Sequence, residues 1–152
     1  MGHLFSVIRV AAALAISWVG IGMAAAGTMP RYGVFVYSNL CIEGDSGDTA
    51  GTRITLYRYP EGDRVMYEYA EGALARPVIA DLVKVDERSG LLRFAVTRPG
   101  AQAETISTRL TNDGEVLSMR GPWCGADVLI RLPRVEDFSR RMQQCRPCPA
   151  RS

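Results

Sequence analysis

Histidine and lysine are scarce in this chain. The one histidine, His3, lies in a leader segment that we expect to be removed on export, and Lys84 is the one lysine. Without histidine, a mature chain cannot use Ser-His-Asp or Cys-His catalysis, and it cannot bind zinc, copper or haem through imidazole. A single lysine also disfavours lysine nucleophiles. The sequence therefore singles out no catalytic residue, no metal ligand and no cofactor.

Long apolar runs are also lacking, with one exception near the N-terminus. The residues from Val10 to Met23 are apolar or small, they follow the positive charge of Arg9, and the small residues 24–27 come next. This order is typical of a signal peptide, so we predict that residues 1–26 are removed. An uncleaved anchor is the alternative, but a helix needs about 20 apolar residues to cross a bilayer. We therefore expect an exported protein, periplasmic or extracellular, that does not span the membrane after cleavage.

Neither sign of charge is in large excess. Of the 18 Lys and Arg residues only Arg9 lies in the leader, and the 17 that remain nearly balance the 16 Asp and Glu residues. Such a balance gives no overall field that would favour nucleic acid, so we expect no nucleic-acid partner. The mature length fits one domain. We divide it into a β domain, residues 27–133, and a cysteine-containing tail, residues 134–152.

Four cysteines are present, and all lie in the predicted mature chain: Cys41, Cys124, Cys145 and Cys148. An even number of cysteines in an exported chain indicates disulfides. We predict the pairs Cys41–Cys124 and Cys145–Cys148. A zinc site of four thiolates suits a reducing compartment better than this one. A redox role for the C-x-x-C motif of the tail is a further alternative, although such thiols are usually activated at a helix N-terminus.

The mature chain consists mainly of short runs with alternating or β-branched residues, separated by Gly, Pro and Asp clusters. This pattern predicts an antiparallel β protein. The expected strands are Tyr32–Ile42, Thr52–Tyr59, Arg64–Ala70, Val78–Val85, Leu91–Thr97, Thr105–Thr111, Glu115–Arg120 and Cys124–Leu132. Because the connections are short, the simplest arrangement of these eight strands is a meander.

A meander of eight strands removes its exposed edges when it closes into a barrel. We therefore predict a small up-and-down, lipocalin-like barrel in which the first strand lies beside the last. A disulfide between Cys41 and Cys124 would join those two strands. After Pro133, the helical spacing of Val135, Phe138 and Met142 predicts a short amphipathic helix.

The best candidate for a binding surface is the hairpin around Pro60-Glu61-Gly62-Asp63. With Glu61-Gly62 as its tip, Ile54 and Leu56 lie on an apolar face that should be core. On the other face, this register places Tyr57 opposite Met66 and Tyr59 opposite Arg64. The composition of Tyr57, Tyr59 and Arg64 is typical of recognition surfaces. Tyrosine is also an ordinary strand residue, so the alternative is a face with no partner.

We predict a non-enzymatic exported binding module for an unidentified protein, envelope component or small molecule. A carrier that holds a small molecule inside the barrel is one alternative. Bulky residues that we expect to face inward favour a filled interior instead: Ile54, Leu56, Tyr67, Tyr69, Phe94, Leu110 and Met119. A carboxylate-based hydrolase or a C-x-x-C redox protein is another, but no pair of acidic residues stands out in the sequence.

Overall fold

The computed structural model describes residues 31–74, 76–111, 114–123, 126–136 and 142–147. The predicted signal peptide, the predicted helix residue Phe138, and two cysteines, Cys124 and Cys148, lie outside these residues. No α-helix is assigned within the described residues. No segment there forms a helix that is long and apolar enough to cross a membrane.

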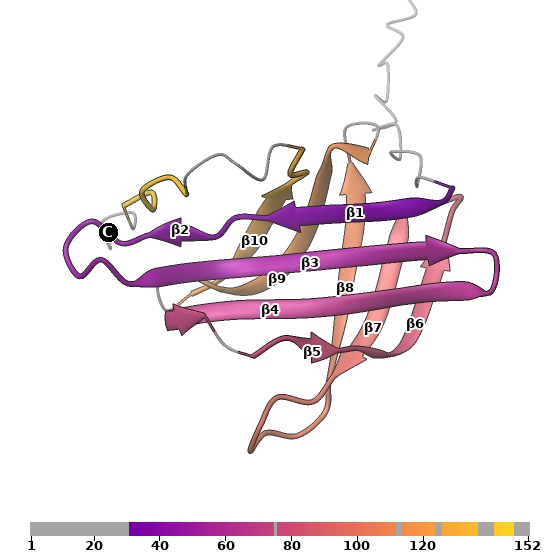
Figure 1. Ribbon diagram of the computed structural model, residues 1–152, viewed down its shortest axis with the longest axis horizontal. Helices are drawn as coiled ribbons and strands as arrows, with labels where there is room; N and C mark the ends of the chain where they lie inside the picture. The colour runs from indigo at the N-terminus through magenta and orange to yellow at the C-terminus, as the bar shows by residue number, and fades with distance from the viewer. Residues whose placement is uncertain (1–30, 75, 112–113, 124–125, 137–141, 148–152) are drawn as a thin grey trace, which may run out of the picture.

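The predicted mostly β, antiparallel architecture is confirmed, and its strands form two sheets (Figure 1). The first sheet contains β1 (Gly33–Ser38), β2 (Cys41–Ile42), β3 (Thr49–Tyr59), β4 (Gly62–Leu74) and β5 (Val78–Ile79), and both β1 and β2 pair with β3. The second sheet has the order β10-β9-β8-β7-β6 and contains β6 (Asp81–Asp86), β7 (Leu91–Val96), β8 (Glu104–Thr111), β9 (Val116–Trp123) and β10 (Ala126–Pro133). In Figure 1 the first sheet lies in front, and the strands of the second sheet cross behind it.

The predicted closed barrel is wrong for the part of the chain that the structure describes. The predicted strand Val78–Val85 divides into β5 and β6, which belong to different sheets. At this corner, Leu82 has a positive φ of 51°, and the pairing with β7 shifts register between Asp81 and Lys84. A bulge of this kind lets a chain pass from one sheet to the next.

The predicted first strand, Tyr32–Ile42, is also interrupted, between β1 and β2. The Asn39 side chain accepts a hydrogen bond from the Thr52 backbone N–H at 2.8 Å, which holds the interruption against β3. Gly51 lies beside it with φ +113°, and a Cβ atom there would come within 2.8 Å of the Asn39 carbonyl oxygen. The close approach of these two strands therefore requires glycine at position 51.

The core lies between the facing surfaces of the two sheets. Alternate residues of most strands point inward, and the large side chains among them are fully or nearly fully buried. The predicted inward residues are confirmed as core, with Tyr69 only partly buried at its margin: Ile54, Leu56, Tyr67, Phe94, Leu110 and Met119. Apolar side chains from both sheets thus fill the space that the barrel hypothesis assigned to an interior.

Tyr37 places a polar group in this core. Its ring is fully buried, and its hydroxyl donates a hydrogen bond of 3.0 Å to the Gly114 carbonyl oxygen. Burial raises the pKa of Tyr37 to about 12, an effect that nearby Arg134 reduces and Glu115 increases. The folded state therefore strongly favours the neutral phenol.

Alkaline pH should reveal this buried hydroxyl. The raised pKa means that the contribution of Tyr37 is fully present below pH 10, the pKa of an unfolded tyrosine, and is lost as pH rises towards 12. We expect the free energy of unfolding to fall by about 2 to 3 kcal/mol over this range, more steeply than in Tyr37→Phe. Urea unfolding at several pH values measures the difference. Identical pH profiles for the two proteins would contradict the assignment.

The disulfide joins Cys41 to Cys145, with 4.9 Å between their Cα atoms. The predicted pairs Cys41–Cys124 and Cys145–Cys148 are therefore wrong, because Cys41 and Cys145 are bonded to each other. Backbone hydrogen bonds explain the choice, since the Ile42 N–H donates to Gln143 and the Cys145 N–H donates to Ile42. These bonds place the two cysteines side by side.

The tail follows the outer edge of β1 and β2. Arg134 forms an isolated bridge with Tyr37, and the Val135 N–H donates to the Val36 carbonyl oxygen at 2.8 Å. Where the structure describes the predicted helix, at 134–136 and at Met142, the chain is not helical. The tail therefore supplies backbone partners to an edge that would otherwise be open.

Candidate functional site

The β3–β4 hairpin carries the three predicted binding residues. Its tip is Pro60-Glu61, because Tyr59 pairs with Gly62, so the predicted tip at Glu61-Gly62 is wrong. Proline has no N–H to donate to a ladder and its fixed φ suits the first position of a turn, which favours the observed tip. The resulting shift is two residues, and a shift of two keeps every side chain on its predicted face.

The outward face of the first sheet combines aromatic and aliphatic side chains from four strands. Tyr57 of β3 lies opposite Arg64 of β4 and Val34 of β1, and Met66 lies opposite Ile79 of β5. Tyr59 is 46% exposed and Ile79 is 66% exposed. A surface depression of about 670 Å³ lies among these residues, lined by Tyr57, Tyr59, Glu61, Gly62, Asp63, Arg64, Val65 and Ile79. We call this outward surface the tyrosine face.

Two arginines lie on the outward side of the first sheet, Arg64 within the tyrosine face and Arg53 farther along β3. Arg64 is exposed and has no ion-pair partner among the described residues. Farther along the strands, Arg53 donates two hydrogen bonds of 2.6 Å to Glu68, whose side chain is almost fully buried. These hydrogen bonds raise the pKa of Arg53. Arg53 is therefore held in place by Glu68, whereas Arg64 is available to bind a carboxylate or carbonyl group of a partner.

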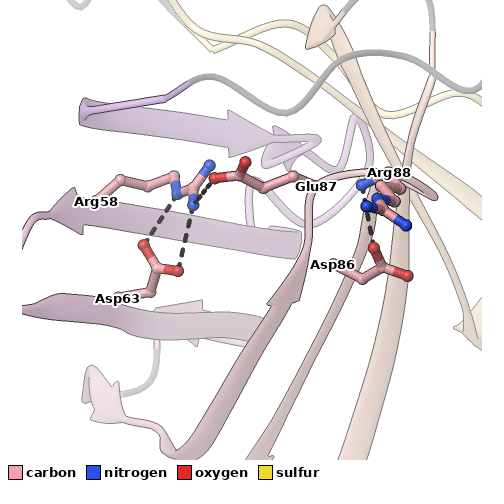
Figure 2. Close-up of polar contacts among 5 residues, drawn as sticks. All are labelled: Arg58, Asp63, Asp86, Glu87 and Arg88. Atoms are coloured by element: carbon pink, nitrogen blue, oxygen red, sulfur yellow. Dashed lines mark hydrogen bonds and ion pairs between the residues drawn. The ribbon is translucent and has the colours of Figure 1, made fainter.

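Arg58 holds the hairpin against the second sheet from the opposite face. Its side chain is only 7% exposed, and it donates hydrogen bonds of 2.9 Å to Asp63 and 2.9 Å to Glu87, as Figure 2 shows. Burial lowers the pKa of Arg58, but the hydrogen bonds to Asp63 and Glu87 outweigh it and give a net increase. The guanidinium stays charged and links the tip of one sheet to a turn of the other.

Asp86 shapes the turn that presents Glu87 to Arg58. Its carboxylate accepts a hydrogen bond of 2.6 Å from the Ser89 hydroxyl and one of 3.0 Å from the Arg88 backbone N–H. Figure 2 shows the bond from Arg88. These hydrogen bonds lower the pKa of Asp86, and the bond from the Ser89 hydroxyl has the largest effect. Aspartate commonly closes a turn in this way. The Asp86 turn and the hairpin tip are therefore parts of one support beneath the tyrosine face.

The structure brings Tyr57, Tyr59 and Arg64 together on one face. Two details differ from the sequence analysis, since Arg64 lies opposite Tyr57 instead of Tyr59, and Met66 lies opposite Thr55. The sequence analysis missed Val34 and Ile79, which come from other strands and carry no local sign of their position. It also assigned no function to Arg58, although an arginine in an apolar alternation five residues before Asp63 was a usable signal.

Three features of the described residues bear on metal, hydrolase and redox chemistry. No group of three or more His, Cys, Asp or Glu side chains there could hold a metal ion. Asp63 and Glu87, two acids that lie near each other, are both bound to Arg58. Cys145 is bonded to Cys41, so it does not form the C-x-x-C disulfide with Cys148.

The outward face of the second sheet is basic. Five cationic side chains from five strands lie on it: Lys84, Arg93, Arg109, Arg120 and Arg131. Arg120 forms an ion pair with Asp127, and Arg109 donates to the Ser89 carbonyl oxygen. Arg131 has no charged partner within the part of the chain that the structure describes. Four arginines and the single lysine of the chain therefore share this surface.

Comparison with known proteins adds no information about the site. No protein-family model matches the chain, and neither the curated proteins nor the solved structures include a match.

Proposed function

We propose that the mature chain is an exported, non-enzymatic binding module that recognises a protein or envelope component through the tyrosine face. The observation that carries this proposal is the exposure of Tyr59 and Ile79 around an open depression. Beside it lies the guanidinium of Arg64, which forms no ion pair with any residue that the structure describes. Aromatic side chains and arginine are the residues that contribute most to protein interfaces, because they combine a large apolar area with hydrogen-bond donors.

Two further observations favour this function over the alternatives. A carrier needs an interior cavity, whereas large side chains such as Tyr37 and Phe94 occupy the space between the sheets. A carboxylate-based hydrolase needs two acids that are free to exchange protons, whereas Asp63 and Glu87 both bind Arg58. The tyrosine face requires neither condition. Its rigid support from Arg58 would lower the entropy cost of binding.

Substitutions on the tyrosine face should weaken partner binding. We expect Tyr59→Ala, and separately Tyr57→Ala, to reduce retention of an envelope component on the immobilised mature protein by at least about tenfold, because central aromatic residues dominate interface energies. Quantitative mass spectrometry of the retained material measures the change. Unfolding midpoints should stay close to that of the wild type, since both tyrosines lie on the outward face.

Ser107→Ala is the matched control. Ser107 is exposed on the outward face of the second sheet, opposite Arg93. It should retain the component as the wild type does. Equal retention by all four proteins would contradict the proposal. A bound small molecule that is released only on denaturation would support the carrier instead.

A further inference from the structure

β10 is an open edge of the second sheet. The edge of β1 and β2 is bonded by the tail, and β6 carries a bulge and Lys84. On the other side of the first sheet, β5 pairs with β4 only at Met66 and Tyr67, and the rest of that edge carries Glu68, Glu71 and Gly72. Within the described residues, the backbone of residues 126–132 bonds to β9 alone. This stretch contains neither Lys nor Pro, two residues that commonly protect an open edge, and its charged residues are Asp127 and Arg131.

Apolar side chains and free space accompany this open edge. Leu129 is 58% exposed, and Val128 is also exposed. A groove of about 1120 Å³ lies beside Val128, Leu129 and Arg131 and is bordered on its far side by the tail. An added strand therefore has room beside β10 and apolar side chains to cover.

Two copies of β10 that run antiparallel to each other have complementary charges. If two copies of β10 pair antiparallel about a two-fold axis at Leu129, Asp127 lies opposite Arg131 of the second copy, and the same pair forms again across the axis. Leu129 then lies opposite its own copy. Moving the axis to Val128 or Ile130 would place Asp127 opposite Leu129 or Pro133. Of these three registers, the one with its axis at Leu129 places Asp127 and Arg131 opposite a charge of the other sign.

We infer that the partner for β10 is a second copy of this chain, which joins the two second sheets into one continuous ten-stranded sheet. Asp127, Leu129 and Arg131 are exposed on the same face, so directly opposite side chains can meet across the new ladder. Asp127 also forms an exposed ion pair with Arg120 of its own copy, and this pair does not depend on the second copy. The contact is isologous, as a two-fold dimer requires.

Charge reversal tests the inference without removing apolar surface. Asp127→Arg places like charges opposite each other at both symmetry-related pairs, and so does Arg131→Asp. Each single variant of the mature protein should raise the dimer dissociation constant by about 10- to 100-fold in analytical ultracentrifugation. An equimolar mixture of the two variants should form a heterodimer, because each cross-copy pair is then again opposite in charge. The double variant should also recover the dimer.

Arg120→Ala is the control, since it removes the Arg120–Asp127 ion pair and leaves the cross-copy pairs intact. It should dimerise within a few fold of the wild type. Circular dichroism confirms that each variant is folded. A wild type that is monomeric at every concentration would overturn the inference. So would a dimer that survives both single reversals, or single variants that are monomeric and stay monomeric when mixed.

Discussion

Replacing both Cys41 and Cys145 with alanine is expected to lower the free energy of unfolding by about 4 to 5 kcal/mol. The two residues are 104 positions apart, so the disulfide closes most of the folded chain into one loop. A loop of that length restricts the unfolded ensemble strongly, which is the main source of the stabilisation. Denaturant unfolding of oxidised wild type and variant, without reductant, measures the difference.

The disulfide should also determine whether the tail stays in place. Backbone hydrogen bonds from Ile42 to Gln143 and from Cys145 to Ile42 lie next to it, and they should exchange their hydrogens faster in the variant. The core amide of Leu92 is the reference and should stay protected. A loss of stability below about 1 kcal/mol would show that the tail contributes little constraint.

Mapping of the oxidised protein by proteolysis checks the pairing itself. Peptides that contain Cys41 and Cys145 should be joined. We expect the intact mass to lie about four hydrogens below that of the reduced chain cleaved before Gly27, as two disulfides require.

Replacing Arg58 with alanine is expected to cost about 3 kcal/mol of stability. Arg58 is the buried cation that neutralises Asp63 and binds Glu87, and removing one member of such a pair leaves the other without compensation. Glu87 is largely exposed and can be solvated, so the estimate lies at the lower end of the range for buried pairs. Chemical denaturation measures the change.

A double-mutant cycle separates charge from packing at this position. Arg58→Met keeps most of the side-chain volume but leaves the Asp63 carboxylate without its cation. Asp63→Asn removes that carboxylate, so the double variant should recover part of the lost free energy of unfolding. Arg120→Ala is the matched control, because its ion pair with Asp127 is exposed and should contribute less than about 1 kcal/mol. If Arg58→Ala costs no more than this control, the network does not support the hairpin.

The local alternation of apolar and polar residues was sufficient to predict which side chains face the core. The alternation in β3 and β4 predicted that Ile54 and Leu56 would be buried and that Tyr59 would face outward, and the structure agrees. These assignments held even though the register was wrong by two residues. Side chains alternate with a period of two, so a shift of two residues exchanges cross-strand neighbours without exchanging faces.

Which distant segments of the chain contact each other depended on the tertiary structure. Nothing near Val78 indicated that the chain would pass from one sheet to another between Ile79 and Asp81, since a strand that bends at a corner has the same alternation as a straight one. Only the folded chain places Cys145 beside Cys41, and only it places Glu87 within reach of Arg58. Such contacts are set by the packing of the whole core and by the path of each connection.

By itself, the sequence determined that this protein is antiparallel and mostly β, which residues face the core, and that Tyr57, Tyr59 and Arg64 share an outward surface. Periodicity and turn chemistry act over a few residues, so they can be read along the chain. The division into two sheets, the Cys41–Cys145 pairing and the open edge at β10 were decided by the tertiary structure. They depend on which distant segments pack together, and several arrangements satisfy the same local pattern.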